Sequence, residues 1–460
     1  MKVISDLQLH SKYARAVSPQ MIIPYIWEWA KTKGIGLIAT GDWTHPLWFR
    51  EIKNDLEEMG NGLLRIKNHE SRIMNEGEGP LFLLETEVSC IYSQGGKLRR
   101  IHTLIWAPTI ESVEKINKKL ASMGANLMSD GRPIMGLTSK QIVDTVLSID
   151  PKCLIIPAHA WTPWFSLYGS RSGYDSINDC FGSYSKQIFA VETGLSSDPS
   201  MNWRIKELEN RSIVSFSDAH SLEKMGREVT VLAPRKNKIS NLKSQISNIS
   251  EFSYKDIIDS FKQDPNGKFE IAYTIEFYPE EGKYHYTGHR LCGVSYSPSE
   301  THEKGTICPV CKRPLTVGVM HRVDDLAAVT GENFTEEKDT YGVVWIKDKD
   351  HVRPSYVSLV PLLEVLSEAL LSGVSSGSVV SAYETLTSQF GSEMNVLLKT
   401  DIDAIRRVSG ERVAEGIKKV RRRDISVAPG FDGEYGKVKI WSEKKQEETT
   451  VDQTQLGFGF

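Results

Sequence analysis

Three absences narrow what this sequence of 460 residues can encode. It holds no run of about 18 apolar residues, so it predicts no helix that crosses a membrane and no membrane partner. Its first residues, MKVISDLQLH, begin a strand pattern without the apolar core of a signal peptide, and we therefore expect a cytoplasmic protein. Only six cysteines are present, which in so long a chain argues against a fold held by disulfides.

The sequence also lacks a strong excess of charge. Its 56 basic and 59 acidic residues give a formal net charge of -3, so the chain as a whole does not attract nucleic acid. Whether it binds nucleic acid depends instead on where the basic residues cluster. A GxxxxGK[ST] phosphate loop is missing, so a helicase activity has no support. The composition, 40% hydrophobic and 25% charged, is that of an ordinary globular protein with two or three domains.

What the sequence has in abundance is metal-ligand residue types at the ends of buried strands. The stretch at 34–46, GIGLIATGDWTHP, contains an apolar strand pattern that ends in Asp42 and His45. Five further strands end in the same way, in Asp6, Gln8 and His10, in Glu85 and Glu87, in His159, in Glu192, and in Asp218 and His220. One such ending is more often a turn residue or a helix cap, but six in half of the chain indicate a multi-metal centre.

The residue types favour a particular chemistry. Asp6, Gln8 and His10 alternate and so share one face of a strand, as do Glu85 and Glu87, and His102 follows on the next strand. Carboxylates mixed with imidazoles suit two or three divalent ions such as Zn²⁺ or Mn²⁺ better than Mg²⁺ alone. Such a cluster predicts phosphoester hydrolysis, with Glu87, His159 and Asp218 as the catalytic residues.

Strands alternate with helical patterns over the first part of the chain. Helices are expected at 19–33, 110–123 and 139–149 between the buried strands. This alternation predicts an α/β fold in which repeated βα units form a parallel sheet closed into a distorted barrel, and we assign residues 1–280 to it.

A second metal site follows the barrel, at residues 281–325. His289 and Cys292 form one knuckle, and Cys308 and Cys311 form another after an interval of fifteen residues. This is the spacing of a tetrahedral structural Zn²⁺ site, with His285 or His302 as alternatives to His289. Such a small segment depends on the ion for its fold.

Residues 326–443 are expected to form a helical DNA-binding domain. The stretch 401–423 combines an apolar stripe with many basic residues and resembles half of a helix-hairpin-helix motif. A solvated helix face is the alternative, but the basic run favours a phosphate backbone. The basic candidates are Arg406, Arg407, Lys418, Lys419, Arg421, Arg422 and Arg423. Residues 444–460 read as a flexible tail whose apolar end is a docking peptide.

At the strand endings that contain the candidate metal ligands, the sequence resembles the polymerase-and-histidinol-phosphatase (PHP) family. The resemblance implies a distorted βα barrel with a two- or three-metal phosphoesterase site. Its expected ligands are Gln8, His10, Asp42, His45, Glu87, His102, His159, Asp218 and His220. Gln8 stands where the family has a histidine. The family also has a histidine directly after the aspartate that corresponds to Asp42, whereas here Trp43 follows and His45 comes two residues later. The ligand roles of Gln8 and His45 are therefore open.

Over nearly the whole chain the sequence is similar to the endonuclease Q branch of that family. TGDWTHP, PAHAWTPWF, ETGLSSDPSMNWR, SDAHS and GFDGEYG carry this resemblance. It implies a nucleoid-associated DNA repair enzyme that nicks double- or single-stranded DNA on the 5′ side of uracil, hypoxanthine, xanthine or an abasic site. Drawing a damaged base out of the stack requires an aromatic wall, for which Trp161, Trp164, Phe165 and Tyr168 are the candidates, with packing at the barrel rim as the alternative.

The end of the tail resembles peptides that dock on a DNA sliding clamp. Gln453, Leu456 and Phe458 fit the bacterial pattern Gln-x-x-Leu-x-Phe, and Phe460 adds a second aromatic residue. An archaeal clamp would fit this spacing less well.

Two other functions are compatible with parts of the sequence. A PHP-type phosphatase acting on small phosphomonoesters accounts for the barrel ligands but leaves the zinc module, basic helices and tail without a task. A DNA-binding adaptor with a weakened catalytic site would account for Gln8.

Overall fold

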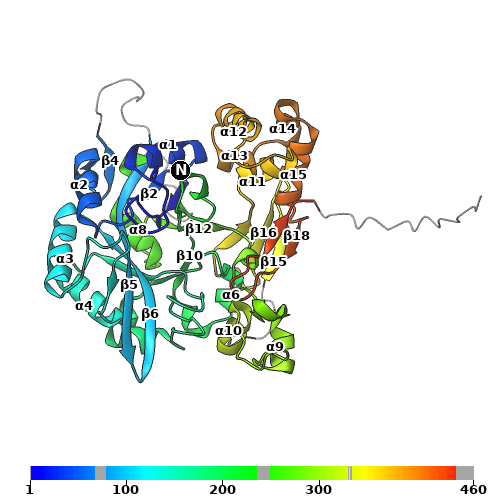
Figure 1. Ribbon diagram of the computed structural model, residues 1–460. Coiled ribbons are helices and arrows are strands. Elements are labelled where there is room, and N and C mark those ends of the chain that lie inside the picture. The colour runs from blue at the N-terminus through cyan, green and yellow to red at the C-terminus, as the bar shows by residue number, and fades with distance from the viewer. Residues whose placement is uncertain (1, 68–78, 236–248, 330, 332–333, 442–460) are drawn as a thin grey trace, which may run out of the picture.

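The computed structural model describes residues 2–67, 79–235, 249–329, 331 and 334–441. The first 280 residues form a lobe of mixed strands and helices, and two smaller units lie along one side of it (Figure 1). The upper unit is a cluster of helices and the lower unit contains the cysteine motifs. Among the described residues no helix is both long and apolar enough to span a bilayer.

The first lobe is built around a ring of short strands. β1 (Val3–Asp6), β2 (Leu37–Ala39) and β5 (Leu81–Gln94) run parallel to one another. β6 (Lys97–Ala107) then pairs antiparallel with β5 on one edge and with β8 (Leu154–Pro157) on the other. These five strands form more than half of the ring.

A parallel pair, β9 (Ala190–Glu192) and β10 (Ser212–Val214), occupies the remaining side. The Ala160 amide donates to the Glu192 carbonyl over 3.0 Å, and the His10 amide donates to the Ala219 carbonyl over 3.0 Å. These bonds join the pair to β8 and to β1. One apolar cluster receives a side chain from every strand of the ring: Val3, Leu37, Leu83, Leu104, Ile156, Ala190 and Val214.

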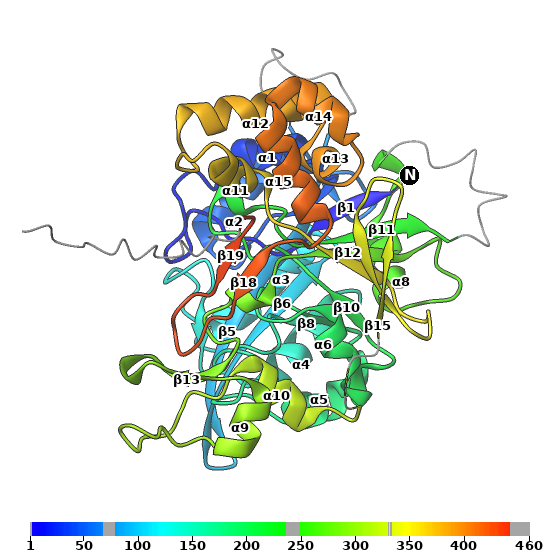
Figure 2. The same cartoon turned by 90° about the vertical axis from the view of Figure 1, so that its right-hand side faces the viewer.

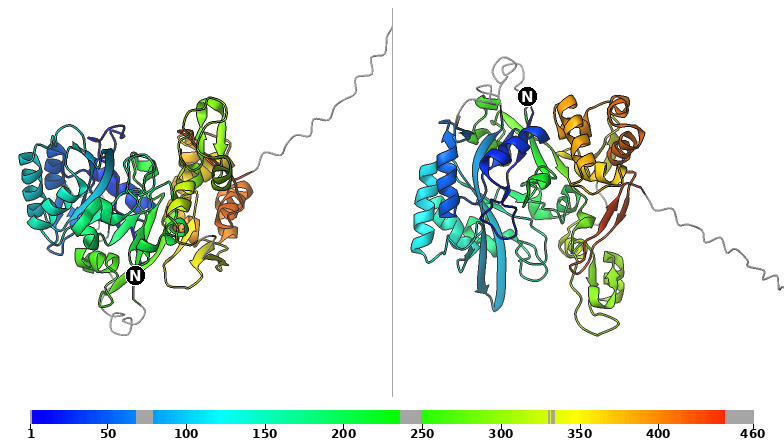
Figure 3. Two further views of the ribbon diagram at one scale, coloured as in Figure 1. Left: turned by 90° about the horizontal axis from the view of Figure 1, so that it is seen from below. Right: turned by 45° about the horizontal axis from the view of Figure 1, so that its top comes forward.

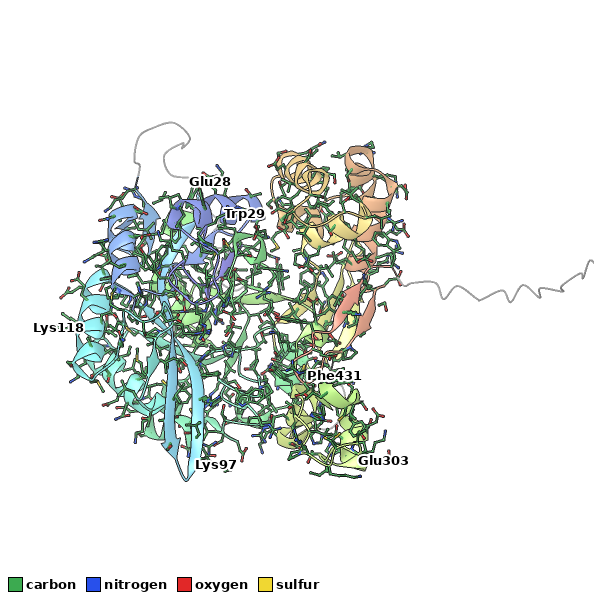
Figure 4. All side chains as sticks on the ribbon, in the orientation of Figure 1. Glu28, Trp29, Lys97, Lys118, Glu303 and Phe431 are labelled. Atoms are coloured by element: carbon green, nitrogen blue, oxygen red, sulfur yellow. The ribbon has the colours of Figure 1, made fainter. Side chains whose placement is uncertain are left out.

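The expectation of an all-parallel sheet is wrong, although the fold is α/β. β5 and β6 form one long antiparallel hairpin, with Lys97 at its tip (Figure 4). The turn consists of Gly95 and Gly96, both at positive φ (59° and 72°), a conformation that glycine adopts without steric cost. A two-residue connection leaves no room for the crossover helix that a parallel pair requires.

Helices cover the outside of the ring (Figure 2). α1 (Ile23–Lys33) and α2 (Pro46–Asp55) follow the first two strands. α3 (Ile110–Ser122) and α4 (Ser139–Ile149) begin at Thr109 and Thr138, whose side chains accept hydrogen bonds from the first helical turns. The expected helices agree with these bounds to within a residue, except that the first starts four residues later. Shorter elements of this lobe are β3 (Leu56–Glu58), β4 (Leu64–Ile66), β7 (Ile134–Met135), α5 (Ile177–Phe181), α6 (Pro199–Trp203) and α8 (Tyr254–Phe261).

The sheet continues past the ring into the second half of the chain. β11 (Val229–Pro234) pairs antiparallel with β1, and β12 (Phe269–Glu276) pairs with β11. β17 (Ser355–Ser358), β16 (Val344–Asp348) and β15 (Phe334–Lys338) extend the same sheet. The start of the region expected to be helical is therefore strand.

Five helices pack against this extension (Figure 3), and their apolar side chains form one core with those of β11, β12 and β17. They are α11 (Leu362–Ala369), α12 (Gly377–Phe390), α13 (Glu393–Leu398), α14 (Ile402–Ser409) and α15 (Glu411–Arg421). A hairpin of β18 (Ser426–Ala428) and β19 (Lys437–Lys439) follows. The cysteine unit below contains β13 (Thr287–His289), β14 (Val294–Tyr296), α9 (Pro298–Lys304) and α10 (Val319–Leu326).

Candidate metal centre

Two groups of three metal-ligand side chains meet where β1, β8 and β10 end, next to the middle of β5 and β6. The first triad is His10, Asp218 and His220, from the segments after β1 and β10. Nε2 of His10 lies 3.2 Å from Oδ1 of Asp218, and the rings of His10 and His220 lie 4.8 Å apart edge to face. One ligand atom from each residue lies within 4.8 Å of the others, as a shared ion would require.

The second triad is Glu87, His102 and His159. Glu87 and His102 lie on the paired strands β5 and β6, in diagonal positions, and His159 follows β8. Oε1 of Glu87 lies 2.5 Å from Nδ1 of His102 and 3.3 Å from Nε2 of His159. These three ligand atoms also lie within 4.8 Å of one another.

Glu87 connects the two triads. While Oε1 faces His102 and His159, Oε2 lies 3.2 Å from Nε2 of His10. A single buried carboxylate thus faces both groups, which is the arrangement that a pair of neighbouring divalent ions uses.

The electrostatics of the cluster favour positive charge. Burial alone would raise the pKa of Glu87, but the charge of Arg132 and the hydrogen bond with His10 hold this pKa well below its usual range. Burial would likewise lower the pKa of His10, but Asp42 and Asp218 hold it well above its usual range. The carboxylates that stabilise a positive charge on His10 would stabilise a bound divalent ion in the same way.

One histidine of the second triad, His102, is kept neutral. Burial lowers the pKa of His102 to about 4, an effect that outweighs the opposing charge of Glu87. A neutral imidazole offers a lone pair to a metal ion. In the first triad, Nε2 of His10 and Oδ1 of Asp218 are buried and receive no well-aligned hydrogen bond from any described residue. The donor set and these two atoms fit divalent metals.

Three residues of the centre have strained backbones. Asp42, His159 and Asp218 have φ values of 47°, 29° and 46°. Residues other than glycine rarely adopt this conformation, and each instance costs roughly 1–3 kcal/mol. Gly194 packs so closely that a Cβ on it would lie 2.3 Å from Cβ of His159, so the position accepts only glycine. The surrounding structure therefore fixes where these side chains point.

Three expected ligands belong to neither triad. Asp42 accepts hydrogen bonds from Nδ1 of His10 (2.9 Å) and from the amide (2.6 Å) and hydroxyl (2.7 Å) of Ser11, so it orients His10. His45 caps α2 by accepting from the Trp48 amide over 3.5 Å. Gln8 is buried and donates to Oε2 of Glu87 over 3.0 Å. Spacing along the chain could not distinguish these supporting roles from ligation.

Two further residues of the centre, Arg132 and Glu192, were not among the expected ligands. Nη1 of Arg132, in the loop before β7, lies 3.4 Å from both oxygens of Glu87. Glu192 accepts a hydrogen bond from the strained amide of His159 over 2.6 Å. Glu192 was visible as one of the strand endings, but nothing in its spacing assigned it this task, and Arg132 lies outside every motif.

The cysteine unit brings His289, Cys292, Cys308 and Cys311 together. One ligand atom of each lies within 4.8 Å of the others, and Sγ of Cys311 lies 3.4 Å from Nδ1 of His289. Neither His285 nor His302 belongs to this group, so the structure favours His289 among the three histidines. Four ligands of these types fit a tetrahedral Zn²⁺.

The two tryptophans expected to stack on a base differ in exposure. Trp161 is 1% exposed, and its indole N–H donates to Asn202 over 2.8 Å, so it packs inside the lobe and cannot meet a base. This corrects the expectation for Trp161, and Tyr168 is likewise buried, with its hydroxyl donating to Glu207 over 2.8 Å. Trp164 is half-buried and lies edge to face with Tyr284 at 5.5 Å.

The basic residues of α14, of α15 and of the turn that follows α15 separate into three sets. Arg421 is 1% exposed and donates to the backbone carbonyls of residues 396, 397 and 400, so it holds the helices together rather than facing DNA. Ion pairs engage three others, Arg406, Lys419 and Arg423. Arg407, Lys418 and Arg422 have no ion pair within the described part of the chain. The expected clamp peptide at Gln453, Leu456, Phe458 and Phe460 lies outside the described residues.

Comparison with solved structures gives two matches over almost the entire chain. One is the crystal structure of the lesion-specific endonuclease PfuEndoQ from Pyrococcus furiosus, with 29% identity and a TM-score of 0.75, covering 98% of this chain and 100% of that one. The other is endonuclease Q in complex with a 27-mer duplex substrate with an abasic lesion at the active site. It has 30% identity and a TM-score of 0.76, with coverage of 97% of this chain and 100% of that chain.

Sequence relatives extend the comparison. YqxK of Bacillus subtilis is 29% identical over 348 residues, 74% of each chain. MJ0043 of Methanocaldococcus jannaschii is 30% identical over 301 residues, 64% of this chain but only 33% of that protein, so the match spans about a third of its length. A family model described as the MJ0043 C-terminal domain matches residues 361–424, the region of α11 to α15.

Proposed function

We propose, since the chain belongs to the endonuclease Q family, that this protein is a DNA repair endonuclease that cuts a phosphodiester bond on the 5′ side of a damaged nucleotide. Its substrates would be deaminated bases, namely uracil, hypoxanthine or xanthine, and abasic sites. The observation that carries the proposal is Glu87, which presents one oxygen to each of two complete metal-ligand triads.

The side chains of the centre divide the work of such a reaction. His10, Asp218 and His220 would hold one divalent ion, and Glu87, His102 and His159 the other, with Zn²⁺, Mn²⁺ or Mg²⁺ as the candidates. When bound, such ions polarise a phosphoryl group and lower the pKa of water. Arg132, beside Glu87 and partly exposed, can donate two N–H groups to a phosphate oxygen pair.

Damage recognition would depend on how easily a nucleotide leaves the stack. Mispaired, deaminated and abasic positions are unstacked most cheaply, which favours them over intact pairs in any site that acts on extruded nucleotides. Trp164 is the remaining tryptophan that could line the path of the strand.

The other parts of the chain have supporting tasks in this proposal. Residues 1–280 would be the PHP-type barrel, 281–325 the zinc-binding module, 326–443 a DNA-binding unit and 444–460 a tail. The nearly closed strand ring supports the first assignment, and the grouping of His289, Cys292, Cys308 and Cys311 supports the second. Binding to chromosomal DNA would place the protein at the nucleoid.

The free basic side chains of α14 and α15 would contact the DNA backbone. Each neutralised phosphate contributes about 0.9 to the slope of log K against log salt for duplex DNA. Replacing Arg407, Lys418 and Arg422 by Gln should therefore lower this slope by up to about 3 units. The Arg421→Gln variant should instead lose helical stability, because the guanidinium of Arg421 donates to four backbone carbonyls.

The proposal is tested with duplexes that carry one uracil, hypoxanthine or abasic site, in Mn²⁺ or Mg²⁺, with the product ends mapped. We expect a single nick 5′ of the lesion and none in the undamaged duplex. Glu87→Gln and Asp218→Asn should abolish nicking and retain DNA binding, while Glu111→Gln on the exposed surface of α3 should match the wild type. A wild-type protein that leaves all three lesions intact would refute the proposal.

The same assay separates the two rival functions. A PHP-type phosphatase would hydrolyse nitrophenyl phosphate and ignore the uracil-containing duplex. A DNA-binding adaptor would bind the duplex without cutting it. The adaptor was suggested by Gln8, but both triads are complete without a ligand at that position, which supports catalysis.

A sliding clamp is proposed as partner on sequence alone. The pattern of Gln453, Leu456 and Phe458 motivates it. Deleting the last eight residues should abolish co-elution with a bacterial sliding clamp and leave intrinsic nicking unchanged. Co-elution that persists after the deletion would refute this part of the proposal.

A further inference from the structure

An aromatic strip with basic side chains runs from the metal centre across to the cysteine unit. Its aromatic members are Trp164, Tyr284 and Tyr435, which come from three distant parts of the chain, and its basic members are Lys283 and Arg290. None of these residues belongs to either triad. The side chain of Tyr435 is 66% exposed, so its ring is open to a ligand.

The strip is continuous with the second triad. The hydroxyl of Thr162 lies 3.4 Å from Nδ1 of His159 and donates to the carbonyl of Trp164 over 2.9 Å. Trp164 then contacts Tyr284 with ring centroids 5.5 Å apart. A nucleotide strand leaving the metal centre on this side would meet these rings in order.

Tyr435 is held at the end of the strip by a rigid loop, residues 430–436. Backbone amides of Gly430, Gly433 and Gly436 donate to carbonyls of residues 280, 283 and 281 over 2.8–3.0 Å. A Cβ on Gly436 would lie 2.1 Å from the carbonyl oxygen of Glu280, so only glycine lets the loop sit this close. Phe431, at the base of the loop, lies at the junction with the cysteine unit (Figure 4).

Two cations accompany the aromatic rings. Nζ of Lys283 lies 4.4 Å from the ring centre of Tyr435. Arg290 is exposed, directly follows the expected zinc ligand His289, and its amide donates to Asp432 of the rigid loop over 2.8 Å. The zinc module and the glycine loop therefore fix both charges beside the rings.

We propose that this strip binds unstacked nucleotides of the DNA strand next to the lesion, and the proposal rests on the nuclease function proposed above. Aromatic rings separated along a groove and interleaved with cations are how proteins hold single strands without sequence preference, because every base has a face to stack. Because the loop at residues 430–436 is already ordered, binding does not incur the entropic cost of ordering it. The strip would keep the distorted strand open while the phosphodiester bond lies in the metal centre.

The test uses 2-aminopurine placed at successive positions on either side of an abasic site, in the presence of Ca²⁺ to prevent cutting. Wild-type protein should quench its fluorescence at one or more flanking positions, and Tyr435→Ala should lose this quenching and bind about tenfold more weakly, since one base stack is worth that much. Tyr435→Phe, which keeps the ring, should resemble the wild type. Lys283→Gln should lower the salt slope of binding by about one unit.

A matched control is Tyr25→Ala, on α1. Tyr25 is 50% exposed, and α1, which carries the labelled Glu28 and Trp29 at the top of Figure 4, lies apart from Phe431, so the loss of Tyr25 should leave DNA binding unchanged. If the wild type nicks at lesions while Tyr435→Ala retains full affinity and quenching, the strip proposal is overturned and the nuclease proposal stands. If the wild type cuts no lesion, the nuclease proposal itself has failed.

Discussion

Nδ1 of His10 and Oδ1 of Asp42 form a buried hydrogen bond of 2.9 Å, which turns Nε2 of His10 toward Glu87 and Asp218. Asp42 is thus an orienting residue. Removing such a partner of a ligating histidine typically lowers metal affinity 10- to 100-fold.

Asp42→Asn should therefore weaken metal binding by about that factor, while the protein keeps its fold. The amide has one acceptor instead of two, so it cannot serve both His10 and Ser11. The measurement is the Mn²⁺ concentration that gives half-maximal nicking. An unchanged midpoint would show that Asp42 does not orient His10.

Lys33 of α1 and Glu393 of α13 form an ion pair of 2.8 Å that joins the first lobe to the helical unit. The two side chains are 1% and 3% exposed, and Glu393 also accepts hydrogen bonds from Tyr383 (2.8 Å) and from the Leu362 amide (3.0 Å). Lys33→Met leaves a buried carboxylate without its cation, which should cost about 3–5 kcal/mol of stability. Differential scanning calorimetry would record a lower melting temperature.

The exposed pair of Lys53 and Glu114 provides the control. Its nitrogen–oxygen distance is also 2.8 Å, but the side chains are 41% and 51% exposed. Lys53→Met should cost under about 1 kcal/mol, since water screens the pair. If Lys33→Met and Lys53→Met lost the same amount of stability, burial would not be what makes the first ion pair important.

Glu276 should make stability depend on pH. Burial raises its pKa to about 8, although hydrogen bonds from Ser215 and Thr274 oppose the shift. The folded protein then keeps this proton up to about pH 8, whereas the unfolded chain releases it near the ordinary value of 4.5. Raising the pH from about 5 to 8 therefore favours unfolding, by up to several kcal/mol.

Glu276→Gln removes the ionisation and should flatten the fall in melting temperature between pH 6 and 9. The quantity to compare is the melting temperature of the variant minus that of the wild type. This difference should increase as the pH rises. A constant difference across this range would mean that Glu276 does not retain its proton in the folded protein.

The cysteine unit should depend on its ion. Structural Zn²⁺ sites contribute roughly 10–16 kcal/mol to the folding of small modules, far more than the apolar cluster of Val294, Cys308 and Leu315 can supply. Cys308→Ser should remove one zinc per chain and make residues 285–316 sensitive to protease, while the first lobe stays resistant. Loss of zinc without increased cleavage would contradict this role.

The sequence predicted the elements whose signals are local. The helix bounds near 110–122 and 139–149 follow from apolar periodicity and threonine caps, and the knuckle spacing predicted the grouping of His289 with the cysteines. Strand endings correctly indicated that His10, Glu87, His159 and Asp218 meet at a common centre.

What the sequence could not separate is ligation from support. Asp42 and His45 have the residue types of ligands, but a hydrogen bond and a helix cap occupy them. Trp161 and Arg421 look like contact residues, but tertiary packing buries both. Arg132 reaches Glu87 from a loop with no pattern at all. These outcomes depend on contacts between distant segments, which composition and periodicity do not encode.

The most direct test of the two-triad centre is anomalous scattering from crystals of the protein grown with Mn²⁺. We predict two manganese positions on either side of Glu87, one among His10, Asp218 and His220 and the other between His102 and His159. A single manganese site, or sites away from Glu87, would contradict the account.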